Sequence, residues 1–154
     1  MVADDSWMEK LWIWADEHNI STKRVPRTKD ALLEMKHLDL IMVYFGLNKI
    51  PSEEWPENPS LLKQEEKKRF VKRLLKKGTF PEEIGRLHQL EGLCINYNYI
   101  ERLPESILNL KNLKKLCLCH NKNLILTFEQ KLWIWELEKK GCVIECDANL
   151  ISID

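Results

Sequence analysis

Several features that mark other protein classes are scarce or missing in this sequence of 154 residues. No apolar run approaches the roughly 20 residues that a membrane-spanning helix needs. Residues 1–7 contain no basic stretch followed by an apolar one, so the sequence predicts no secretory signal. The five cysteines are odd in number, and their spacing is unlike the disulfide framework of a secreted domain. We therefore expect a cytoplasmic protein with reduced thiols.

Motifs of catalytic sites are missing as well. The sequence has no glycine-rich phosphate loop, no His-Glu-x-x-His motif and no serine in a nucleophile elbow. The four histidines have no partner at a spacing that would imply catalysis. We therefore expect no enzymatic activity and no cofactor. Acidic and basic residues number 24 each, so net charge argues neither for nor against a nucleic-acid partner.

What the sequence does contain is a repeat with an offset of 23 residues between positions 81 and 121. The matching pairs are Pro81 and Pro104, Ile84 and Ile107, Leu87 and Leu110, Leu90 and Leu113, Leu93 and Leu116, Ile95 and Leu118, and Asn98 and Asn121. One such phrase would be weak evidence, whereas two copies in register indicate a repeating structural unit.

The spacing within each copy predicts its local structure. Leu93 and Ile95 alternate with polar or small residues, which indicates one face of a short strand. The leucines at steps of three that precede the strand fill the interior of the same unit. Asn98 and Asn121 follow the strands, where an inward amide can pair the backbone groups of a buried turn. One unit cannot bury its apolar side alone, so neighbouring units are expected to stack.

This phrase resembles that of the leucine-rich repeat superfamily, and in particular its short bacterial members. The resemblance covers roughly residues 31–51 and 79–147. It implies an α/β fold: a small right-handed solenoid of about three coils, with a parallel sheet on the concave side and helical caps at both ends. It implies a habit of binding proteins or peptides, and it implies no chemistry.

The expected organisation is a single domain over residues 1–154. Residues 6–20 form an N-terminal cap helix with Ser6 as N-cap, 31–51 a degenerate first repeat, 52–79 a helical insertion, 80–126 two regular repeats, and 127–147 a closing helix and strand. Thr127 and Gln130 have the spacing of a capping box. The same pentapeptide, Lys-Leu-Trp-Ile-Trp, occurs at 10–14 and at 131–135. Two caps converging on similar packing and an ancestral duplication are both open.

The concave face is the candidate binding site, because the residues that flank the inward leucines project from it. These residues are His37, Asp39, Gly92, Cys94, Asn96, Tyr97, Lys115, Cys117, Cys119 and His120. Cys94 and Cys117 are equivalent positions on adjacent strands, roughly 5 Å apart. A zinc site made by the cysteines and His120 is an alternative, but the spacing of a zinc ribbon is missing and small apolar cysteines are common on strands. We therefore predict no metal.

The predicted function is non-catalytic binding of a peptide or small protein epitope on the concave face, by a monomer. An alternative is a nucleic-acid or acidic-surface binder that works through the basic helix 61–77, with a face formed by Lys67, Lys68, Lys72, Arg73 and Lys76. No aromatic platform or recognition-helix motif accompanies that helix. A second alternative is a structural module that associates with itself through the edge of its last strand.

Overall fold

The computed structural model describes residues 4–41, 53, 56–74, 80–98 and 100–151. Within them the helices are α1 (Ser6–Glu17), α2 (Lys29–Glu34), α3 (Gln64–Leu74) and α4 (Phe128–Lys139). The strands are β1 (His37–Asp39), β2 (Gly92–Cys94), β3 (Lys115–Cys117) and β4 (Val143–Glu145), and short 3-10 helices are η2 (Pro59–Leu61), η3 (Glu82–Arg86) and η4 (Glu105–Asn109).

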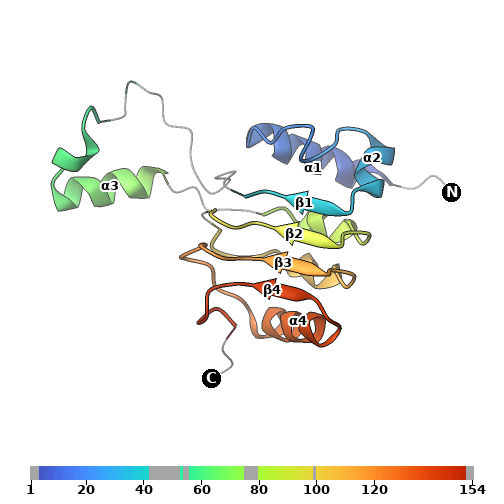
Figure 1. Cartoon of the computed structure of the whole chain (residues 1–154). Helices are drawn as coiled ribbons and strands as arrows, with labels where there is room; N and C mark the ends of the chain where they lie inside the picture. The colour runs from blue at the N-terminus through green and yellow to red at the C-terminus, as the bar shows by residue number, and fades with distance from the viewer. Residues whose placement is uncertain (1–3, 42–52, 54–55, 75–79, 99, 152–154) are drawn as a thin grey trace.

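The four strands form one parallel sheet in the order β1-β2-β3-β4. Leu38, Leu93, Leu116 and Ile144 lie side by side across it. The strands stack without curling into an arc (Figure 1). The surface that was expected to be concave is therefore referred to as the exposed sheet face. An α/β fold with a parallel sheet is thus confirmed, and the strand in the last segment joins the sheet beyond the two regular repeats.

The other face of the sheet is covered by the apolar core. The leucines and isoleucines of the 23-residue phrase are buried, as are residues of α1 and α4 at the two ends. η3 and η4 stack so closely that a Cβ on Gly85 would lie 2.5 Å from the carbonyl oxygen of Ser106. Glycine is therefore required where these two segments cross.

The two asparagines of the repeat tie neighbouring units together, as their spacing predicted. The Nδ2 of Asn121 donates to the carbonyl oxygens of Leu118 and of Ile95, each at 3.0 Å, and Ile95 belongs to the preceding unit. Asn98 binds Ile95 and Leu40 in the same way, at 2.9 and 2.8 Å. Both asparagines are buried. They satisfy backbone groups that would otherwise be unpaired inside the turns.

The two end helices begin differently. Thr127 and Gln130 form the predicted capping box, and the buried Gln130 also donates to the carbonyl oxygen of Leu103 at 3.1 Å. The prediction for Ser6 was wrong: α1 starts at Ser6 itself, Asp5 is the N-cap residue, and the side chain of Asp5 makes no capping hydrogen bond. The backbone N–H of Ser6 instead pairs with a carboxylate oxygen of Asp4, two residues earlier.

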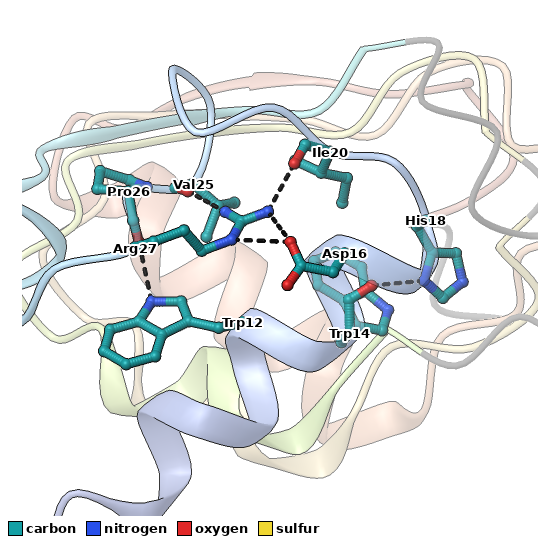
Figure 2. Close-up of polar contacts among 8 residues, drawn as sticks. All are labelled: Trp12, Trp14, Asp16, His18, Ile20, Val25, Pro26 and Arg27. Atoms are coloured by element: carbon teal, nitrogen blue, oxygen red, sulfur yellow. Dashed lines mark hydrogen bonds and ion pairs between the residues drawn. The ribbon is translucent and has the colours of Figure 1, made fainter.

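The segment after α1 folds back over that helix (Figure 2). The Nε1–H of Trp12 donates to the carbonyl oxygen of Pro26 at 2.9 Å, and Arg27 pairs with Asp16 at 2.8 Å. Arg27 also donates to the carbonyl oxygen of Ile20 at 2.7 Å. These contacts cover one flank of the N-terminal helix.

α3 begins at Gln64, three residues after the predicted start at Leu61, and it stands apart from the sheet (Figure 1). Leu61 belongs to η2, while residues 75–79 lie outside the described part of the chain. Of the predicted first repeat, α2 and β1 are described and residues 42–51 are not. β1 nevertheless pairs directly with β2, so the whole segment 40–91 is one connection between neighbouring strands.

Candidate functional site

The exposed sheet face is built by the residues that alternate with the inward leucines. Its first row is His37, Gly92, Lys115 and Val143, and its second row is Asp39, Cys94, Cys117 and Glu145. The predicted positions on the first three strands are therefore brought together. Val143 and Glu145 were missed, although the alternation between Cys142 and Cys146 is the signal that would have found them.

Not every predicted position presents a side chain to a partner. Gly92 is buried beneath the imidazole of His37, and an added Cβ would lie 2.5 Å from its Nδ1. Cys117 is 1% exposed. The Oδ1 of Asn96 accepts the backbone N–H of Cys119 at 2.6 Å. These residues shape the face or hold its turns, so the surface available for contact is narrower than the predicted list.

The exposed sheet face carries charges of both signs. The Nζ of Lys115 lies 3.8 Å from Glu145 across the β3–β4 boundary. Lys114 and Glu91, which directly precede β3 and β2 and do not belong to the two rows, form a second pair at 3.3 Å. All four side chains are partly or largely exposed, so each pair adds little stability. Asp39 is exposed on β1, at the opposite end of the second row. The face therefore offers both signs of charge and no strong field of one sign.

An aromatic pair stands just beyond the ends of β2 and β3. The rings of Tyr97 and His120 are stacked, with centroids 4.2 Å apart and planes 11° from parallel. Both residues have positive φ angles, 58° and 60°, and each directly precedes an inward-turned asparagine of the repeat. Tyr97 is 48% exposed. The sequence placed both residues on this face but gave no indication of their stacking.

Of the cysteines on the exposed sheet face, Cys117 is buried, whereas Cys94 and Cys119 are partly exposed. Burial raises the pKa of Cys117, and hydrogen bonds with Cys94 and Glu145 raise it further. Burial also raises the pKa of Cys119, and the nearby Asp147 and Glu145 act in the same direction. A raised pKa disfavours the thiolate, which is the form that attacks electrophiles and binds metals. All five cysteines are unpaired by disulfides.

The part of the chain that the structure describes contains no preformed metal site. There, no group of three or more histidine, cysteine, aspartate or glutamate side chains is placed to hold an ion. In the same residues no helix is both long enough and apolar enough to span a bilayer.

The alternative basic face is described only in part. Lys67 and Lys68 are exposed on α3, and Lys68 lies 3.5 Å from Glu65. The helix also contains Lys72 and Arg73, whose side chains lie outside the described part, as does the whole of Lys76.

Comparisons with known proteins return no relative. No protein-family model matches the chain, and searches of curated proteins and of solved structures find no significant similarity.

Proposed function

We propose that this chain is a small leucine-rich repeat protein whose exposed sheet face binds a peptide or a small protein epitope without catalysis. The observation that carries the proposal is the register of that face, because paired strands hold outward side chains in two fixed rows. A right-handed solenoid of few coils is the architecture that this stacking and the 23-residue phrase favour.

The fixed geometry lowers the free-energy cost of binding. Association loses free energy whenever side chains or loops must be ordered at the interface. Here the asparagine bonds between units order the turns next to the face before any partner arrives. The stacked Tyr97 and His120 supply an aromatic anchor, a residue class enriched among the side chains that dominate interface energies.

The partner is expected to be a short extended segment with mixed charge. Its acidic side chains would pair with His37 or Lys115, and its basic ones with Asp39 or Glu145, all on the two rows described above. An aliphatic or aromatic side chain would pack on Tyr97. The short strands of the face suit an epitope of a few residues better than a large flat surface.

The test is affinity capture with two variants that leave the core intact. Asp39→Arg combined with Tyr97→Asn changes two exposed positions of the face, and asparagine tolerates the positive φ at position 97. Lys111→Glu is the matched control, because it reverses an exposed charge away from the face. A protein retained by wild type and control but lost by the double variant supports the proposal. Equal retention by all three contradicts it.

A second candidate function has its own observation. α3 stands apart from the sheet (Figure 1), and residues 61–77 contain eight lysines or arginines and two glutamates. Such a helix would bind phosphates or anionic headgroups, with an affinity that falls steeply as salt rises. Lys67→Glu with Lys68→Glu would abolish that binding, while the Asp39→Arg, Tyr97→Asn variant would leave it unchanged.

A further inference from the structure

Two thiols lie side by side in the second row of the exposed sheet face. Cys94 on β2 and Cys117 on β3 are direct partners in the parallel register. The backbone N–H of Ile95 donates to the carbonyl oxygen of Cys117 at 2.9 Å, which fixes the register beside the pair. The two thiols are also hydrogen-bonded to one another, and neither is part of a disulfide. The sheet therefore holds two reduced sulfur atoms next to each other.

The spacing of neighbouring strands meets the geometric requirement of a disulfide. Paired strands lie about 4.8 Å apart, which is within the range of roughly 4.4–6.8 Å between Cα atoms that a disulfide spans. Cys94 and Cys117 also project from the same face, because each follows an inward leucine that pairs with its counterpart on the other strand. The two sulfur atoms can therefore be joined within the existing register.

The other three cysteines do not share this geometry. Cys119 follows β3, and two residues of chain add roughly 6.6 Å to its distance from Cys94, which takes it beyond the reach of a disulfide. Cys142 and Cys146 flank β4 in the inward phase of its alternation, and both pack with the core. Cys94 and Cys117 are thus the pair that the sheet places for a covalent link.

We infer that Cys94 and Cys117 form a reversible disulfide that locks β2 to β3 when the chain meets a low-molecular-weight disulfide such as oxidised glutathione. The thiolate of Cys94 attacks the small disulfide, whose sulfur–sulfur bond breaks as a mixed disulfide forms and one small thiol leaves. Cys117 then attacks the sulfur of Cys94 and expels the second small thiol. Two protein thiols are oxidised, one small disulfide is reduced to two thiols, and the two protons pass to these thiols.

Burial sets the order and the rate of the two steps. Cys117 is 1% exposed, whereas Cys94 is partly exposed, so a dissolved disulfide reaches Cys94 first. Burial also raises the pKa of Cys117, so its thiolate is scarce and the closing step is the slow one. The carboxylate of Glu145 is hydrogen-bonded to the Cys117 thiol and is placed to relay its proton. This modification does not depend on the binding function proposed for the same face.

Thiol counting on the full chain tests the inference. The chain is incubated for hours with oxidised glutathione at mildly alkaline pH and low micromolar concentration, then denatured, alkylated and weighed by mass spectrometry. Two of its five thiols should be lost, and dithiothreitol should restore them. A chain that keeps all five thiols overturns the inference, as does one that stops at a glutathione adduct or links to a second copy.

Tryptic digestion locates the bond. Cleavage after lysine and arginine leaves Cys94 on the peptide 87–102, while Cys117 and Cys119 share the peptide 116–122. These two peptides should be linked in the oxidised chain. Cys119→Ser is the matched control and should still form the link, whereas Cys117→Ser should stop at the mixed disulfide on Cys94. A link that is lost in Cys119→Ser, or kept in Cys117→Ser, overturns the assignment.

The stability of the wild-type chain provides a test that needs no substitution. A bond between Cys94 and Cys117 closes a loop in the chain and restricts its unfolded state, so oxidation should raise the midpoint of thermal unfolding by roughly 5–10 °C. Reduction should reverse the rise, and Cys117→Ser treated in the same way should not show it. An oxidised wild type that unfolds at or below the midpoint of the reduced chain contradicts a lock between the two strands.

Discussion

The Oδ1 of Asn121 accepts the backbone N–H of Asn98 at 3.2 Å, so one asparagine of the repeat binds its counterpart in the preceding unit. Together with the two carbonyl oxygens that its Nδ2 reaches, Asn121 satisfies three buried backbone groups in two units. The side chain acts as a bridge between turns, and its removal has consequences in both.

Asn121→Ala is expected to lower the free energy of unfolding by about 3 kcal/mol, because buried backbone groups lose their partners. Urea unfolding followed by circular dichroism measures the change. Asn123→Ala is the control, because Asn123 is exposed; we expect its effect to stay within about 0.5 kcal/mol. Equal effects of the two substitutions would show that the bridge adds no stability.

The two crowded glycines should respond differently to the same substitution. Gly85→Ala places a Cβ 2.5 Å from a backbone oxygen of Ser106, which cannot move alone, and we expect a loss of about 1–3 kcal/mol. Gly92→Ala meets the ring of His37, a side chain that can rotate away, so its loss should be below about 1 kcal/mol. Thermal unfolding of both variants provides the comparison. A larger loss for Gly92→Ala would contradict this account.

The two helix starts form another matched pair. Thr127→Ala removes the hydroxyl that accepts the backbone N–H of Gln130 at 3.1 Å, so it should destabilise the chain by about 1 kcal/mol. Ser6→Ala removes no helix cap, and we expect almost no change. The denaturant midpoints of the two variants, measured side by side, test this expectation. An equal loss of stability in both would indicate that both helices begin with a capping box.

Alkaline pH should destabilise the fold through its buried thiols. Burial raises the pKa of Cys117 above the ordinary thiol value of 9.0, so above about pH 9 the unfolded chain ionises this thiol while the folded chain does not. Its contribution to stability is complete below that pH and declines above it, by at most about 1.4 kcal/mol per pH unit.

The measurement is the free energy of unfolding at pH 7 and pH 10 for wild type and Cys117→Ala. Ionisation of lysines and tyrosines is common to both proteins, so the difference between their slopes isolates this thiol. The alanine variant should lose less stability over the interval. Parallel slopes would show that Cys117 ionises equally in the folded and unfolded chains.

Much of the sheet could be predicted because its determinants are local and repeated. The alternation around Leu93 and Leu116 specified the inward faces of β2 and β3, and the 23-residue offset specified their register. The turn hydrogen bonds of Asn98 and Asn121 and the Thr127–Gln130 capping box could also be predicted. Each of these interactions joins residues only three positions apart in the sequence.

Other features depend on neighbours that no local pattern specifies. Ser6 and Glu9 have the spacing of a capping box, yet the helix begins one residue too early for it. The two copies of the pentapeptide bury different tryptophans, because the packing surface at each end of the stack sets the rotation of its helix. The stacking of Tyr97 on His120 likewise depends on the distance between two successive turns. The order of residues within one turn does not specify that distance.

The long connection between β1 and β2 has a consequence for the order of assembly. Neighbouring strands of this sheet are usually joined by short segments, such as the one between Gly92 and Lys115. The segment between His37 and Gly92 is roughly twice as long. Loop closure costs about 0.6 kcal/mol more for each doubling, and contacts distant in sequence form later. We therefore expect the β2–β4 region to form first. The N-terminal helix and β1 are expected to join its edge afterwards and to separate from it first when the protein unfolds.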